Sequence, residues 1–175
     1  KKQYWDVNKC DDISSQTLAE ELFDFGVNAG PPTAAKILQR LVDVKDDGNL
    51  GEMSLYAINC AICFDLFSLQ LNFALEKIKH YHRISKAPGS ENRKYIHGWL
   101  NRTYEIFDGF YEIDDLKRIV QKTSSDGKTG PKNMRGLKLY LEEDYNNLLR
   151  FIKIYDANIA YKTNKNVNAL ISALE

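Results

Sequence analysis

The chain has 175 residues, enough for one solid hydrophobic core or two small ones. Its 24 Lys and Arg residues balance its 24 Asp and Glu residues, and 43% of the chain is hydrophobic. This composition excludes wholesale disorder, and the zero net charge excludes recruitment to nucleic acid or anionic lipid by charge alone. No uninterrupted apolar stretch reaches the roughly 18 residues of a membrane helix, so we expect a soluble protein without membrane insertion.

Helical periodicity dominates the first half of the chain. Thr17, with Glu20 three positions later, predicts a capping box at the start of a first helix, which Gly30 and Pro31 end. A second helix begins at the prolines and is expected to end near Asp46. Its apolar positions follow helical spacing at Ala34, Ile37, Leu38, Leu41 and Val42.

A turn at Asp47, Gly48 and Gly51 precedes a long apolar pattern over residues 55–81, which predicts either two packed helices or one kinked helix. Residues 86–92 are typical of a loop, and residues 95–107 predict another helix. Two further helical stretches follow, at 116–120 and 145–159. No β-hairpin alternation appears, so the predicted fold class is all-α.

The Asp-Gly-x-x-Gly turn recurs 79 residues later at Asp126, Gly127 and Gly130. This echo arises either from duplication of a helix-turn-helix unit or from two independent uses of a good turn sequence. Neither turn can be a calcium loop. In the first, Lys45 stands where an oxygen ligand belongs and Ser54 where a bidentate Glu belongs.

The three cysteines, Cys10, Cys60 and Cys63, give an odd count that argues against a disulfide framework. Cys60 and Cys63 have Cys-x-x-Cys spacing, but no second Cys or His pair lies at zinc spacing. We therefore expect both to be small buried hydrophobic residues. The sequence predicts no metal site and no cofactor.

Two groups of side chains have the chemistry of a sugar site. Asp24, between Phe23 and Phe25, is the most sheltered carboxylate, and glycoside hydrolysis needs a sheltered acid. Asp24 acts either in that way or, as we favour, as a structural residue bonded to nearby backbone or to Asn28. Trp99 lies four residues after an aromatic tyrosine and either stacks on sugar rings or packs in the core.

Several strings occur in the order and rough spacing of one family. They are Tyr4-Trp5-Asp6, AEELFDFGVNAG at 19–30, AAKILQR at 34–40, the turn at 47–51 and GWLNR at 98–102. In these strings the chain resembles the bacterial and phage N-acetylmuramidases once called secretion activators, glycoside hydrolase family 108, with their predicted peptidoglycan-binding region. The resemblance covers about residues 4–104.

The resemblance implies a lysozyme-like helical domain at residues 1–104 that acts on or binds the glycan strands of peptidoglycan. Residues 105–175 are then a helical extension or a second cell-wall-binding unit. Asp24, Asn28 and Gly30 become candidate substrate-binding residues, together with Trp99. An Asn offers a donor and an acceptor to an N-acetyl group, and a Gly permits close approach of a glycan. The implied location is the periplasm or cell envelope, or the cytoplasm before release for a phage-encoded protein.

The chain departs from the family at the catalytic acid. The family carries that acid in a Glu-Gly-Gly motif upstream of its Tyr-Trp-Asp element, whereas the first Glu here is Glu20. The chain starts at Lys1 without Met, so we expect either that an upstream segment supplies the acid or that this lineage lost it. The predicted function is part of a muramidase whose catalytic residue is unknown. The alternatives are a non-catalytic peptidoglycan-binding module and a helical interaction protein of a secretion or phage assembly.

Overall fold

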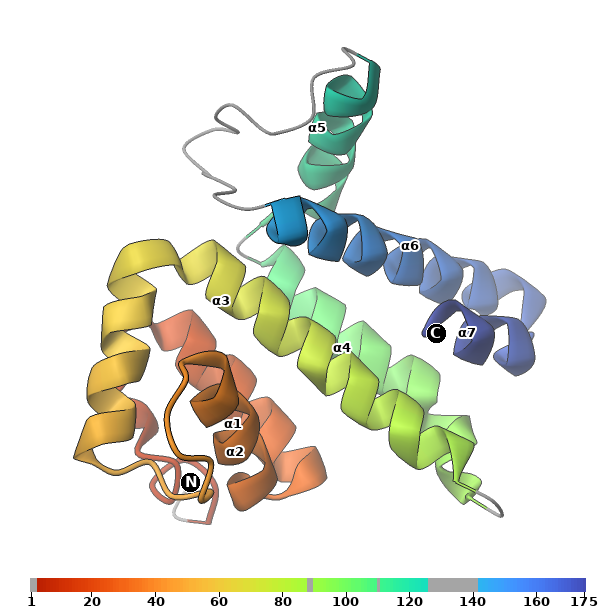
Figure 1. The fold of residues 1–175 in the computed structure, drawn as a ribbon. Helices are drawn as coiled ribbons and strands as arrows, with labels where there is room; N and C mark the ends of the chain where they lie inside the picture. Colours follow the sequence, from red (N-terminus) through yellow and green to blue (C-terminus); the bar gives the residue numbers. More distant parts are fainter. Residues whose placement is uncertain (1–2, 88–89, 110, 126–141) are drawn as a thin grey trace. The chain divides into compact units, whose positions relative to one another are not determined.

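The computed structural model describes residues 3–87, 90–109, 111–125 and 142–175, in which every regular element is a helix (Figure 1). The all-α prediction is confirmed, and the helices are consistent with a lysozyme-like domain followed by a helical extension. The second Asp-Gly turn, at 126–130, lies outside the described residues. The elements are η1 (Cys10–Asp12), α1 (Gln16–Ala29), α2 (Pro31–Leu41), α3 (Glu52–Lys86), η2 (Glu91–Tyr95), α4 (Ile96–Asp108), α5 (Ile113–Ser125), α6 (Glu142–Asn164) and α7 (Val167–Ala173).

The chain forms two compact units, Lys1–Phe73 and Ala74–Glu175, and the boundary between them falls inside α3. This boundary reflects packing. The predicted division after residue 104, which separates regions by their function, stays a prediction.

Ser15, not Thr17, caps the start of α1. The Ser15 hydroxyl accepts a hydrogen bond from the Leu18 amide at 3.3 Å, so the predicted capping box at Thr17 is wrong. Thr17 lies inside the helix, where its hydroxyl lies 2.8 Å from that of Ser15 and accepts a hydrogen bond from Gln70 of α3 at 2.9 Å. A local sequence rule could not foresee this tertiary partner.

A buried glutamine organises the turn between α2 and α3. The Gln39 Nε2 atom lies 3.0 Å from each of three acceptors, the Asp47 carboxylate, the Asn49 carbonyl and the Ser54 hydroxyl. Its Oε1 atom accepts the Gly48 amide at 2.9 Å. The side chain has no exposed surface, so this turn forms part of the first unit's core.

Helix α2 starts at the prolines as predicted but ends at Leu41 rather than near Asp46. Val42 leaves the helix, and Asp43 adopts a positive φ of 54°. Residues 42–46, which the apolar pattern placed in the helix, instead lead into the turn that the Gln39 side chain stabilises.

Helix α3 is one kinked helix, which is one of the two forms that the sequence predicted. Asp65 has non-helical torsion angles of φ −158° and ψ 86°. Its carboxylate accepts a hydrogen bond from the Ser68 amide at 3.0 Å, in the manner of a cap on the second half. The kink therefore separates a first straight segment, Glu52 to about Phe64, from the rest of α3.

The second unit packs α4 and α7 against α6. Tyr104 and Phe107 of α4 each place a ring 4.6 Å from the ring of Phe151 in α6. The Tyr104 hydroxyl donates to the Phe151 carbonyl at 2.9 Å, and burial raises the pKa of Tyr104 well above its usual value. Figure 1 shows α7 folding back beside α6. The inner face of α4 is thereby committed to the core.

Candidate functional site

The last turns of α1 hold two of the predicted site residues, Asp24 and Asn28. Asp24 is only 4% exposed, whereas Asn28 is exposed. The Asn28 amide donates to the main-chain carbonyl of Asp24 at 3.3 Å. The helix therefore brings the two residues together, with the Asp24 side chain buried and the Asn28 side chain at the surface.

The sequence analysis predicted Asp24 as the most sheltered carboxylate, but Glu21 is buried even more fully. Glu21 is 1% exposed, and its carboxylate lies 3.5 Å from the Gln70 amide nitrogen. One signal was present in the sequence, since Glu21 lies three residues after Leu18 and four before Phe25, on the apolar side of α1. Both carboxylates are buried, and a general acid must come within hydrogen-bond reach of the glycosidic oxygen.

Gly30, the third predicted residue, joins α1 to α2. Its φ of 88° and ψ of 142° form a combination that essentially only glycine adopts. No atom lies within 4 Å of the position that a Cβ would take. The backbone conformation explains this glycine, and the open space beside it is compatible with the predicted approach of a ligand.

Trp99 lies in the second unit, on α4, in the middle of a row of three neighbouring aromatic rings. Its ring is 4.9 Å from that of Tyr81 at an interplanar angle of 20°, and 5.9 Å from that of Tyr95 at 38°. Tyr81 is buried, Trp99 is half-buried, and Tyr95 is 51% exposed. The row thus leads from the core to the surface. The stacking on Tyr81 gives Trp99 a packing role, and its predicted role in stacking on sugar rings stays a prediction.

Gly98, beside Trp99, has no structural reason to be glycine. It lies inside α4, where glycine costs about 1 kcal/mol relative to alanine. Its φ is not positive, and within the described part of the chain no atom of another element lies within 4 Å of a Cβ placed there. Together with Trp99 and Arg102 of α4, and with Tyr95 at the end of η2, Gly98 forms what we call the α4 outer face, whose residues follow helical spacing.

A closed ring of hydrogen bonds fixes the orientation of α4. His97 Nδ1 lies 2.7 Å from Asn158 Oδ1, the Asn158 amide donates to Asn101 Oδ1 at 2.8 Å, and the Asn101 amide lies 3.2 Å from His97 Nε2. The ring closes when His97 is neutral with its proton on Nδ1, because Asn158 Oδ1 can only accept. Asn101 of the GWLNR string is therefore a positioning residue that ties α4 to α6.

The Tyr4-Trp5-Asp6 string has a packing role. The rings of Tyr4 and Trp5 meet the Phe23 ring edge-on, with centroids 6.5 and 5.6 Å away. The Trp5 indole also donates to the Asp11 carboxylate at 2.7 Å. These contacts hold the N-terminal segment against α1.

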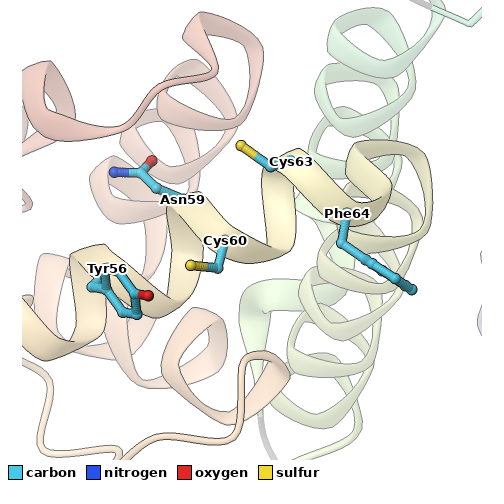
Figure 2. A pocket seen from close by; sticks show the side chains of 5 residues that line it. All are labelled: Tyr56, Asn59, Cys60, Cys63 and Phe64. Carbon is cyan, nitrogen blue, oxygen red and sulfur yellow. The ribbon is translucent and has the colours of Figure 1, made fainter.

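The prediction that Cys60 and Cys63 are buried is wrong. Both thiols are exposed on the first segment of α3, where they line a shallow depression of about 490 Å³ with Tyr56, Asn59 and Phe64 (Figure 2). Apolar residues surround the first segment of α3, but in this segment other parts of the protein cover only the side that carries Ser54 and Ile58. Among the described residues, no three His, Cys, Asp or Glu side chains gather as a metal site would require.

Helix α3 also meets the length and composition of a membrane-spanning helix. One 18-residue window in it has a mean hydropathy of 1.5, and 44% of that window is buried within the protein. A core helix of a globular protein has the same properties. The expectation of no membrane insertion therefore stays a prediction.

Two family models match the chain. Residues 1–30 match the family described as Glycosyl hydrolase 108, and residues 33–104 match the Predicted Peptidoglycan domain. The second match ends at the residue where the resemblance was expected to end, and it includes the α4 outer face. No curated protein and no solved structure matches the chain. The predicted resemblance to family 108 muramidases with a peptidoglycan-binding region is confirmed.

Proposed function

We propose that this chain, a peptidoglycan-directed protein related to the family 108 muramidases, holds glycan strands on the α4 outer face. The observation that carries the proposal is the row of rings from Tyr81 through Trp99 to Tyr95, which reaches the surface beside a glycine that the fold does not require. This face lies inside the segment that matches the peptidoglycan domain. The match also supports an association with the cell wall or envelope.

The chemistry of the face suits an amino sugar. Aromatic rings pack against the apolar C–H face of a pyranose, and the missing side chain at Gly98 lets a bulky sugar approach the helix. Arg102, one turn further, adds a guanidinium that matches the carboxylates of peptidoglycan. At the end of α1, Asn28 and Gly30 are further proposed contacts, with Asn28 bonding an N-acetyl group.

Co-sedimentation with purified sacculi tests this function. Tyr95→Ala should lower the affinity about two- to ten-fold, which corresponds to the loss of about 0.5 to 1.5 kcal/mol for one exposed aromatic contact. Gly98→Leu should lower it at least as much, because the new side chain fills the space left for the sugar. Ile159→Ala removes an exposed apolar side chain of the same unit and should change nothing. Undiminished pelleting of Tyr95→Ala and Gly98→Leu would contradict the proposal.

Cleavage of peptidoglycan is the second candidate function, favoured by the match of residues 1–30 to Glycosyl hydrolase 108. We propose that Asp24 and Glu21 stabilise α1 and do not serve as the general acid, because both side chains are buried. Release of reducing ends from sacculi measures cleavage directly. Activity that is lost in Asp24→Asn or Glu21→Gln, with the fold and sacculus binding preserved, would assign the acid to that residue and overturn this part of the proposal.

A helical interaction protein of a secretion or phage assembly would bind no glycan. Titration with soluble peptidoglycan fragments, followed by amide NMR, separates this possibility from ours. We expect shifts at Tyr95, Gly98 and their neighbours on α4. Shifts scattered over both units, or none at saturating ligand, would favour the assembly role. The proposed location is the periplasmic side of the envelope, or the cytoplasm before release for a phage-encoded protein.

A further inference from the structure

The hydrogen bonds between α4 and α6 form a polar site that the glycan proposal leaves unused. Its members are His97, Asn101 and Asn158, which we call the polar ring. Asn158 is 1% exposed and the other two are half-buried, all within the second unit. The three contacts measure 2.7, 2.8 and 3.2 Å, so each has the length of a hydrogen bond. A buried network of this kind stabilises its helices only while every member has a partner.

The polar ring closes only around a neutral imidazole. Each asparagine amide has one donating and one accepting end, so the third member must have one N–H and one bare nitrogen. Turning both amides over reverses the direction of the hydrogen bonds, but one nitrogen of His97 must still accept. A protonated His97 donates from both nitrogens, and both asparagine oxygens must then face it. The Nδ2 groups of Asn101 and Asn158 would be left facing each other, donor against donor.

The groups that α6 presents to His97 offer no acceptor in exchange. The aromatic ring of Tyr161 lies 4.7 Å from the imidazole, centre to centre. This contact exists whether the imidazole is charged or neutral, so it keeps His97 in place but gives its second N–H no oxygen. Lys165, just after α6, lies over the same tyrosine ring at 5.7 Å. Lys162, one turn after Asn158, is exposed and also positive.

The charged groups of η2 are also unsuited to a protonated His97. Arg93 and Lys94 precede it by four and three residues. Lys94 pairs with Glu91 at 2.6 Å, and Arg93 bonds to Asn168 of α7, a helix without charged residues. Among the described residues, no carboxylate forms an ion pair with His97. Protonation of His97 therefore opens the polar ring without creating a salt bridge.

The polar ring lies in the half of α4 that carries the proposed glycan contacts. Its two α4 members, His97 and Asn101, are one turn apart, and Gly98 and Trp99 lie between them in the chain. The other half of α4 has a tie that acid does not affect. There the Tyr104 hydroxyl donates to an α6 carbonyl, and burial raises the pKa of Tyr104 well above its usual value. Acid that opens the polar ring thus affects the half with Gly98 and Trp99.

We propose that His97 is a positioning residue whose protonation weakens glycan binding on the α4 outer face. Histidine is the side chain that gains its charge between about pH 5 and pH 8. At the upper end of this range the closed polar ring fixes the first half of α4 on α6. As the pH falls, His97 donates from both nitrogens, and this half of α4 loses its polar tie. The inference rests on the proposed function, because it concerns regulation of the same face.

Amide NMR of the full chain without glycan tests the polar ring itself. Between about pH 8 and pH 5.5, the side-chain NH2 signals of Asn101 and Asn158 should shift with the same midpoint as the His97 imidazole. Burial lowers the pKa of His80 and of His82, so their titration curves should differ and serve as internal controls. A His97 that gains its proton while both amide signals stay fixed overturns the proposal. So does a His97 that stays neutral until the protein unfolds.

Co-sedimentation with sacculi over the same pH range tests the regulation. The wild-type affinity should fall by up to about ten-fold for each pH unit below the His97 midpoint, because one proton competes with binding. His97→Phe keeps an aromatic ring beside Tyr161 but lacks both nitrogens, so its affinity should stay level. His80→Gln, a matched control in the same unit, should follow the wild type. Equal pH profiles for the wild type and His97→Phe would contradict the regulation, even if the amide signals titrate.

Asn158→Asp reverses the requirement of the polar ring. The new carboxylate accepts from a protonated His97 and from the Asn101 amide, whose oxygen accepts the other imidazole N–H. The ring then closes around the charged imidazole. His97 should titrate at higher pH in this variant, and sacculus binding should persist on acidification. A variant that loses affinity in acid as the wild type does would refute the inference.

The proposed function and its regulation can fail separately. Sacculus binding at pH 8 that survives both Tyr95→Ala and Gly98→Leu removes the glycan site, and the regulation with it. Binding that is lost in those variants but does not change with pH in the wild type leaves the glycan site in place and overturns the regulation alone.

Discussion

Two glycine-containing elements, one in each unit, differ in what their glycines do for the fold. Gly48 in the turn before α3 has a φ of 83°, and a Cβ there would lie 3.1 Å from the Pro32 carbonyl oxygen. Gly98 in α4 has neither a positive φ nor a neighbouring atom within 4 Å. The turn is explained by folding alone, whereas the α4 outer face lacks such an explanation. The glycan contact proposed above would account for Gly98, and the variants below test that proposal.

The largest effect should come from the residue that holds the turn. Gln39→Ala removes four hydrogen-bonding contacts and leaves buried polar groups without partners. We expect the free energy of unfolding to fall by about 3 kcal/mol, measured by urea denaturation. A loss below about 1 kcal/mol would mean that water replaces Gln39 readily and that the turn is not part of the core.

Gly48→Ala should cause the next largest loss of stability. The positive φ costs a side chain about 1 to 2 kcal/mol, and the close approach to Pro32 adds to this. Thermal unfolding of this variant should show a lower Tm than the wild type, while sacculus binding per folded molecule stays unchanged. If the folded variant bound sacculi less well, the turn would also have a role in binding. Gly48 and Gly98 would then no longer differ in the way proposed here.

Gly98→Ala should act in the opposite direction on stability. The variant should gain about 1 kcal/mol in free energy of unfolding, because alanine favours the helix and meets no neighbour. Its affinity for sacculi should nonetheless fall or stay level. A loss of stability would mean that packing requires a glycine at this position, so that no ligand is needed to explain it.

The smallest expected effect is on the pH dependence of stability, through Asp47 in the turn before α3. The Asn49 amide and the Gln39 side chain hold the pKa of Asp47 below its usual value of 3.8. The carboxylate therefore stabilises the folded state above pH 3.8, and this contribution is lost as the pH falls through the lower folded pKa. Asp47→Asn should flatten the decline of Tm as the pH falls below 3.8. If Tm declined equally in the variant and the wild type, groups other than Asp47 would cause the loss of stability in acid.

The sequence left open whether residues 55–81 form two packed helices or one kinked helix, which the structure decided. By itself it determined the helical class, the start of α2 and the turn before α3. These features depend on neighbours within a few residues, through periodicity, proline and glycine, and so they can be read locally. The family strings added the peptidoglycan-directed character, which the family matches confirm. Asp24, Asn28, Gly30 and Trp99 were predicted at this level as substrate-binding residues, and their role in binding stays a prediction.

Only the tertiary structure decided which faces of the helices are covered. Periodicity shows that one side of a helix is apolar, but burial depends on whether another element lies against it. For this reason Cys60 and Cys63 were expected in the core and lie at the surface, while Glu21 was overlooked and is buried. The same reason applies to Gly98, whose significance comes from the absence of a neighbour that no sequence pattern reports.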